Sequence, residues 1–397
     1  MPISVDPPAP SPLRVGLNLV YLVAESGGSG RYARELIRAM LEVEPDTRIT
    51  AFVSAELPDD VREAPWAAAI DWVRFPISVT HGPPWNLALT MGAQWGALPA
   101  IAAKRRLDVV HGLANITPLA GPRVARVVTL LDLIWIHYPQ TMARRATIGM
   151  KIVAPTSARR AHRVIAISEA AKRDLIVTLG LHPAKIDVTP LGVNLDEVVA
   201  PTAEADLRAR LELGDDPVLL CVAQKREHKN LGTLIRALAG LEDDRVRLVL
   251  PGSSTPHERE LQALAAELGV AERVRFPDWV SDADLEGLYR LATAFVLPSF
   301  VEGFGLPILE AMRRGVPVVC SAGTSLEEVA GDAALLFDPR STVELAAAIE
   351  RLLGDGELRD DLVRRGHARC RELTWKATAR GTLDTYRRAI AARRHDA

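Results

Sequence analysis

Short apolar runs rich in β-branched residues alternate with longer amphipathic stretches along most of the chain. Short apolar runs are typical of buried strands, and amphipathic stretches between them are typical of helices that connect parallel strands. In the first half of the chain, the pattern predicts strands at residues 14–20, 48–53, 108–111, 127–131 and 164–167, and helices at residues 30–43, 85–106 and 169–179.

A second series of the same kind begins after about residue 205. It predicts strands at residues 218–223, 246–250, 274–276, 294–297 and 316–320, and helices that begin near Asn230, His257, Asp282, Leu306 and Thr342. Because 397 residues exceed one ordinary core, we expect an α/β protein with two doubly wound, Rossmann-like domains that face each other across a cleft.

The predicted boundaries place the first domain at residues 1–195 and the second at residues 196–374, with a hinge near residues 192–205. Residues 375–397 predict one further helix, which we expect to cross back onto the first domain. Ligands of open parallel sheets bind beyond the carboxyl ends of the strands, so polar or glycine-rich residues just after predicted strands are the candidates for a site.

Composition narrows the class of protein. The chain is 48% hydrophobic and 25% charged, with a formal net charge of -2, which gives no overall attraction to nucleic acid. Its three cysteines show no metal-binding spacing and predict buried thiols in a reducing compartment. No secretory signal and no apolar run long enough to cross a bilayer is evident, which predicts a cytoplasmic protein.

One stretch, residues 133–168, contains no acidic residue but six basic ones. They are Arg144, Arg145, Lys151, Arg159, Arg160 and Arg163. This stretch could contact an anionic membrane surface or a lipid-diphosphate acceptor, which would make the protein peripheral at the inner face of the membrane. It could equally form an exposed helix whose partners lie elsewhere in the chain.

The most informative stretch is SFVEGFGLPILEAMRRG, which follows the predicted strand 294–297. Gly303 and Gly305 let the backbone approach a ligand, and the N–H groups at the helix start near Leu306 can meet an anion. Glu302 in the turn and Glu310 in the helix can accept hydrogen bonds from pairs of sugar hydroxyls. A solvated loop glutamate and a surface helix glutamate are the structural alternative.

A basic run, VAQKREHKNLGTL, follows the predicted strand 218–223. Lys225, Arg226 and Lys229 lie just before a helix that Asn230 is suited to cap. Cations at the carboxyl end of a strand are suited to hold phosphate, and the alternative is a solvated basic loop.

Three further candidates lie in the first half. Gly28 belongs to GGSGRYA, which fits the dinucleotide pattern G-x-G-x-x-A, but its turn is longer than that pattern requires and suggests a lid over the cleft. Asp132 follows a predicted strand and could cap a turn or serve a site. His111 also ends a strand, where a histidine is either functional or a hydrogen-bonded packing residue.

With these residues assembled, the chain resembles the retaining glycosyltransferases of the GT-B fold in family 4 (glycosyl transferases group 1). The resemblance covers about residues 14–390 and is carried by the E-x7-E pattern of Glu302 and Glu310. The stretches GGSGRYAREL, AISEAAKRDLI, VTPLGVN, KNLGTLIRAL and SLEEVAGDAALLFDP support it in the expected order.

The resemblance implies transfer of a sugar from a nucleotide diphosphate sugar, with GDP-mannose as the candidate donor, to a glycan, lipid-linked or small-molecule acceptor, without a metal or other cofactor. It implies that Glu310 binds the ribose hydroxyls and that Glu302 contacts the donor sugar. The N–H groups near Phe304 to Leu306, together with Lys229 and Gly28, would hold the diphosphate. Glu302, Asp132 and His111 are the candidate catalytic residues.

Two positions depart from the family pattern. An arginine is usual five or six residues before Lys229, where this chain has Ala223 and Gln224, so Lys225 or Arg226 would have to substitute. A histidine is usual immediately before Asp132, where this chain has Leu131, so His111 or His137 would have to compensate.

Three other functions stay open on the sequence. One is a sugar-nucleotide epimerase, which shares the two-domain architecture. The second is an NAD-dependent oxidoreductase built on GGSGRYA. The third is a non-catalytic protein that binds a nucleotide sugar.

Overall fold

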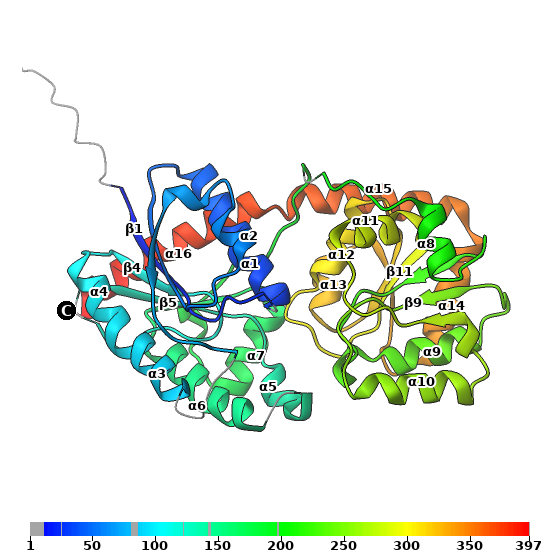
Figure 1. The fold of residues 1–397 in the computed structure, drawn as a ribbon, viewed down its shortest axis with the longest axis horizontal. Helices are drawn as coiled ribbons and strands as arrows, with labels where there is room; N and C mark the ends of the chain where they lie inside the picture. Colours follow the sequence, from blue (N-terminus) through cyan, green and yellow to red (C-terminus); the bar gives the residue numbers. More distant parts are fainter. Residues whose placement is uncertain are drawn as a thin grey trace, which may run out of the picture.

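A computed structural model describes residues 12–24, 26–80, 86–121, 123–141, 144–196 and 198–396, with the main chain alone at 86–87, 144–146 and 395–396. It consists of two lobes, each built on one parallel sheet (Figure 1). Two parallel-sheet, Rossmann-like domains were expected from the alternating pattern, and the fold class is confirmed.

The first sheet has seven strands in the order β3-β2-β1-β4-β5-β6-β7. Its strands are β1 Arg14–Leu19, β2 Arg48–Val53, β3 Ile70–Arg74, β4 Val109–Gly112, β5 Ala125–Leu130, β6 Arg163–Ala166 and β7 Ile186–Val188. The helices are α1 Gly27–Val43, α2 Asp59–Arg62, α3 Asn86–Gly92, α4 Leu98–Lys104, α5 Ile134–His137, α6 Arg144–Arg160 and α7 Glu169–Leu179, with short turns η1 Ala67–Ala69, η2 Ala93–Ala97, η3 Pro139–Thr141 and η4 Pro183–Lys185.

The second sheet has six strands in the order β10-β9-β8-β11-β12-β13. Its strands are β8 Val218–Leu220, β9 Arg247–Val249, β10 Val274–Arg275, β11 Ala294–Leu297, β12 Val318–Ser321 and β13 Ala334–Phe337. The helices are α8 Glu204–Arg210, α9 Leu231–Ala239, α10 His257–Glu267, α11 Asp282–Leu291, α12 Leu306–Arg313, α13 Ser325–Ala330, α14 Thr342–Gly354 and α15 Gly356–Glu372, with short turns η5 Glu227–Lys229 and η6 Ala271–Arg273.

The strands that the sequence analysis did not predict are β3, β7 and β13, and all three lie at sheet edges. An edge strand is covered less completely than a central one, so its apolar run is shorter or is interrupted by polar residues. In β3 (IDWVR) Ile70 is buried, Asp71 and Arg74 are exposed and the two residues between them are partly buried, and β7 has only three residues. The single helix predicted at 85–106 is instead α3 and α4 joined by a π-helical turn.

Helix α16 (Trp375–Asp396) carries the chain from the second lobe back to the first (Figure 1). It packs against α1 and against strands β5 and β6. Trp375 and Tyr386 are buried, and the Trp375 ring lies 6.4 Å from the ring of Tyr32 in α1. At the start of α16, Val193 donates its N–H to the Leu373 carbonyl at 2.9 Å, so the two passages between the lobes touch.

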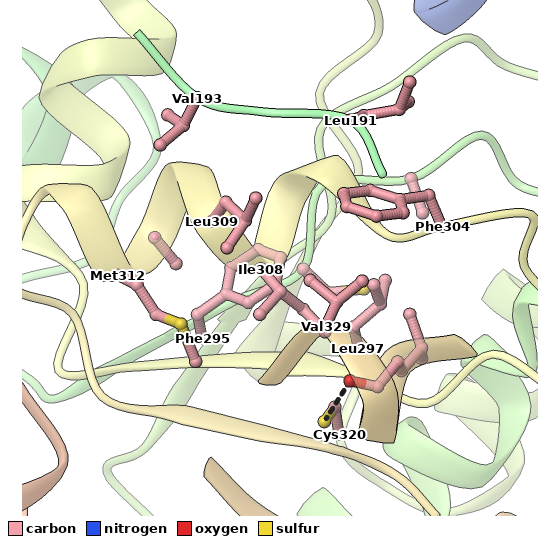
Figure 2. Packing of buried hydrophobic residues seen from close by; sticks show 14 of the residues in the cluster. Leu191, Val193, Phe295, Leu297, Phe304, Ile308, Leu309, Met312, Cys320 and Val329 are labelled. Atoms are coloured by element: carbon pink, nitrogen blue, oxygen red, sulfur yellow. Dashed lines mark hydrogen bonds between the residues drawn. The ribbon is translucent and has the colours of Figure 1, made fainter. Parts of the chain in front are cut away.

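Helix α12 is held from two sides (Figure 2). Ile308 and Met312 are buried toward Phe295 of β11, and Leu191 and Val193, which come from the connection between the lobes, lie on the opposite side of the helix. This packing holds α12 between β11 and the connection that joins the lobes.

Two further findings bear on the sequence analysis. Cys221, Cys320 and Cys370 are free and buried, as predicted. Within the described part of the chain, no helix combines the length and the apolar character needed to span a bilayer.

Candidate active site

Glu302 lies in the loop between β11 and α12, where it meets the basic run that follows β8. Lys229 donates its Nζ to Glu302 Oε1 at 2.6 Å, and the Ser299 hydroxyl donates to the same oxygen at 2.7 Å. Both side chains of the ion pair are largely buried. Among the residues that the structure describes, both partners bind Oε1, which leaves Glu302 Oε2 available to accept a hydrogen bond from a ligand.

The two glycines of this loop are required by close approaches. A Cβ on Gly303 would lie 2.1 Å from the carbonyl oxygen of Leu131 in the first lobe. Gly305, the N-cap of α12, has φ +111°, and a Cβ there would lie 2.4 Å from the Leu326 side chain. The glycines therefore let the loop reach the first lobe and turn directly into α12, and Phe304 between them is buried.

Asp132 stands on the first-lobe side of this contact, directly after β5. Its Oδ1 accepts from the Ile134 N–H at 3.0 Å, so it caps the turn into α5, as one of the two interpretations proposed. Burial raises the pKa of the Asp132 carboxyl, and the neighbouring Glu302 carboxylate contributes to that rise. Asp132 thus bonds the turn that leads into α5 and lies close enough to Glu302 and Lys229 for their charges to affect its pKa.

A second contact joins the lobes beside this loop, at the start of α7. The Ser168 hydroxyl donates to the Gly303 carbonyl at 3.0 Å. The Glu328 carboxylate of α13 accepts from the N–H groups of Glu169 and Ala170 at 2.8 Å and 3.0 Å. A carboxylate at a helix N-terminus is stabilised by the helix dipole, so these contacts hold the glycine loop against the first lobe.

Glu310 lies on α12, and both of its carboxylate oxygens have partners. Arg31 of α1 donates to Oε1 across the lobes, and the Tyr289 hydroxyl donates to Oε2 at 3.0 Å. Burial and the Glu310 charge raise the pKa of Tyr289 well above its ordinary value, which keeps this hydroxyl protonated. The Glu310 side chain is 9% exposed and that of Arg31 is 30% exposed.

Of the basic run, Lys229 pairs with Glu302, whereas Lys225 lies 3.7 Å from Glu258 of α10. Lys225 is completely buried and donates to the carbonyl oxygens of Gly252 and Pro277, and Arg226 donates to the Thr141 carbonyl in the first lobe. Lys225 and Arg226 therefore have backbone partners, and their role at a phosphate stays a prediction. Asn230 begins α9, but its side-chain amide bonds the Pro298 and Pro339 carbonyls.

The other two first-lobe candidates, Gly28 and His111, differ in exposure. Gly28 is exposed in the first turn of α1, and a Cβ there would meet nothing within 4 Å. His111 is fully buried, its Nδ1 bonded to Tyr386 Oη and its Nε2 to Thr129 Oγ1, both at 2.8 Å. Burial lowers the pKa of His111 to about 3, so the ring is neutral. This environment favours the packing alternative over a catalytic role for His111.

The basic stretch at residues 133–168 forms α5, α6, β6 and their connections. Arg163 pairs with Asp187 at 2.5 Å, so at least one cation of this basic stretch has its partner elsewhere in the chain. Lys151 is exposed on α6 beside Ile148 and Ile152, which are 52% and 63% exposed. The side chains of Arg144 and Arg145 lie outside the described residues.

The sequence analysis did not single out Arg31, Tyr289, Ser168 or Glu328. Arg31 lies in GGSGRYA and Glu328 lies in SLEEVAGD, both of which belong to the motifs of the sequence analysis. These motifs indicated the right segments but not which residue in each contacts the other lobe. Tyr289 lies inside the α11 sequence DADLEGLYRL, where nothing distinguishes it from core. In the described residues, no group of three or more His, Cys, Asp or Glu side chains is arranged to hold a metal ion.

Comparison with protein families gives two matches that together follow the two lobes. Residues 26–197 match the family model described as Glycosyltransferase Family 4, and residues 203–369 match the model described as Glycosyl transferases group 1.

Individual proteins agree with these matches. The chain is 32% identical to a D-inositol 3-phosphate glycosyltransferase of Kineococcus radiotolerans over 93% of this chain and 92% of that protein. It is 34% identical to the O-antigen chain mannosyltransferase B of Escherichia coli, in a match that spans 56% of this chain and 60% of that protein. Among solved structures, sucrose-phosphate synthase of Thermosynechococcus elongatus superposes with a TM-score of 0.75 at 24% identity, over 96% of this chain and 100% of that one, which indicates a shared fold.

Proposed function

Because the chain belongs to the family 4 glycosyltransferases of glycosyl transferases group 1, which have the GT-B fold, we propose that it transfers a sugar from a nucleotide diphosphate sugar with retention of the anomeric configuration. The donor would bind at the start of α12 in the second lobe, and the acceptor would bind on the first lobe. The observation that carries this proposal is the Lys229–Glu302 ion pair beside the start of α12, with Glu310 farther along the same helix.

The chemistry follows from charge. As the bond between the sugar and the diphosphate breaks, negative charge develops on the leaving phosphate and positive charge on the sugar ring. Lys229 and the N–H groups at the start of α12 would stabilise the leaving phosphate. Glu302 is held by Lys229 and Ser299 through Oε1, and its Oε2 would accept a hydrogen bond from a hydroxyl of the donor sugar. Glu310 would accept hydrogen bonds from the ribose hydroxyls. The acceptor's proton can pass to the leaving phosphate oxygen on the same face, so this route needs no protein nucleophile.

Asp132 would act on the acceptor side. It lies against the Gly303 loop and near Glu302, so it can reach a hydroxyl that approaches the sugar from the first lobe. Its raised pKa fits a carboxyl that shares this space with another acid.

GDP-mannose is the donor we propose first, because a relative at 34% identity is named a mannosyltransferase. The acceptor is a glycan, a lipid-linked sugar or a small molecule, and D-inositol 3-phosphate is the small molecule that another relative's name supplies. Exposed Lys151, Ile148 and Ile152 on α6 would suit peripheral contact with an anionic membrane that holds a lipid-linked acceptor.

The test is a donor and acceptor screen. Thermal shift with GDP, UDP, dTDP and ADP identifies the base, and the matching nucleotide sugars are then incubated with D-inositol 3-phosphate and with lipid-linked and free glycans. We expect stabilisation by GDP and a product whose new linkage keeps the anomeric configuration, measured by NMR. Conversion of the donor sugar without any acceptor would instead indicate an epimerase, and stabilisation without turnover would indicate a binding protein.

A further inference from the structure

Both oxygens of the Glu310 carboxylate are occupied, although this carboxylate is the proposed ligand of the donor's ribose. Oε1 is paired with Arg31 from the first lobe and Oε2 accepts from Tyr289. Resting on the proposed function, we propose that Arg31 exchanges partners when the donor binds: it leaves Glu310 and binds the diphosphate. Arg31 would then be a donor-binding residue supplied by the first lobe.

The position of Arg31 suits both partners. Gly28 and Arg31 are three residues apart on α1 and therefore lie on the same face of the helix, and the space beside Gly28 is open. On the other lobe, Glu310 follows Leu306 by four residues, which is about 6 Å along the axis of α12. An arginine side chain can span that distance by changing rotamers, and the Arg31 side chain is 30% exposed, which leaves room for such a change.

Charge favours the exchange. A diphosphate carries more negative charge than a single carboxylate, and a guanidinium binds phosphate oxygens through paired N–H groups. Lys229 is the cation of the 225–229 run that contacts Glu302, whereas Lys225 and Arg226 donate to backbone carbonyls. The diphosphate would otherwise meet one lysine and the helix N–H groups, so Arg31 would supply a second cation.

Glu310 would not be left as an unpaired buried charge by this exchange. It would keep the hydrogen bond from Tyr289 and replace Arg31 by the two ribose hydroxyls. The ion pair therefore satisfies both residues in the unliganded protein, and the donor satisfies both after it binds. A ligand that carries only the ribose would have to compete with Arg31 without offering it a phosphate.

The test compares nucleoside diphosphates with nucleosides on Arg31→Met, by calorimetric titration of GDP, guanosine, UDP and uridine. Losing a charged hydrogen-bond donor to phosphate should weaken diphosphate binding by about tenfold or more. Nucleoside binding should be unchanged or tighter, because Glu310 no longer has a competing partner. Arg31→Lys should fall between Met and wild type for the diphosphate.

Arg38→Met is the matched control, since Arg38 lies on the same helix and pairs with Glu35 and Glu42 of that helix. It should leave all four affinities unchanged. If Arg31→Met weakened diphosphate and nucleoside binding equally, Arg31 would only hold the lobes in place, and the inference would be wrong. It would also be wrong if neither affinity changed. If wild-type protein bound none of GDP, UDP, dTDP and ADP, the proposed function itself would fail and this inference with it.

Discussion

The two lobes contribute to the candidate site in different ways. In the second lobe, Lys229, Ser299 and Glu302 already hold one another at 2.6 Å and 2.7 Å, on a loop fixed by Gly303 and Gly305. In the first lobe, Gly28 is exposed and Arg31 reaches across to Glu310, while His111 is buried in a hydrogen-bonded core. The second-lobe part of the candidate site is therefore held in place within its own lobe, whereas the first-lobe part depends on contacts between the lobes.

This difference predicts that second-lobe substitutions impair the chemistry of a folded protein. Lys229→Met should lower kcat by about 100- to 1000-fold, because it removes a fixed cation from the leaving phosphate. Steady-state kinetics measure the loss, and circular dichroism should show an unchanged fold. Lys225→Met is the contrast: it leaves the Gly252 and Pro277 carbonyls without their buried donor, so it should lower the melting temperature and spare the kcat of the folded fraction. Equal kinetic losses in both variants would contradict the distinction.

The next largest effect separates the two glutamates. Glu302→Ala should lower kcat by about 100-fold with little change in donor affinity, because this side chain is assigned to the reacting sugar. Glu310→Ala should raise the Kd of the nucleoside diphosphate by about tenfold, since it loses hydrogen bonds from the ribose. Titration and initial rates on the same preparations separate the two effects. Activity within twofold of wild type in both variants would show that these roles are wrong.

In the first lobe, His111 should make the stability of the folded protein depend on pH. Its pKa is about 3 in the folded protein, below its ordinary value of 6.5, so the unfolded chain binds more protons between those values. Stability is therefore fully present above about pH 6.5 and falls as the pH decreases toward 3. His228, with a pKa lowered to about 4 chiefly by burial, acts in the same direction. Melting temperatures between pH 8 and pH 5 should fall less steeply in His111→Gln than in wild type, and parallel slopes would exclude His111 as a source.

The smallest expected effect concerns metal. We propose that Lys229 and the α12 N–H groups supply the positive charge that faces the diphosphate, so EDTA should change kcat by less than about twofold. Rates with EDTA, Mg²⁺ and Mn²⁺ give the measurement. A loss with EDTA that either ion restores would show that a metal shares this role.

The sequence predicted the parts of this molecule that local pattern controls. Strand β11, helix α7 and the glycine turn at 302–306 follow from apolar runs, capping residues and backbone freedom, all of which are encoded locally. The edge strands β3 and β7 were missed because β3 is interrupted by Asp71 and β7 has only three residues, whereas β10, at the edge of the second sheet, was predicted from its apolar run. Nothing in the local pattern explains why β13 (ALLF) was missed.

The candidate site divides in the same way. Glu302, Glu310 and Lys229 could be found from their spacing after strands, and the structure brings Glu302 and Lys229 into contact. The hydrogen-bond partners of Lys225 and Arg226 could not be predicted, because Gly252, Pro277 and Thr141 are distant in sequence. The same holds for Arg31 and Glu328, whose partners lie on the other lobe.

The chain passes between its lobes twice, and the two passages meet where Val193 pairs with Thr374. Gly192 sits so close to Thr374 that a Cβ there would lie 2.1 Å from its carbonyl carbon. Because the two passages adjoin, we expect them to act as one hinge when the lobes move relative to each other. A side chain introduced at position 192 would clash with the Thr374 backbone, so we expect Gly192→Ala to alter this hinge although position 192 lies outside the candidate site.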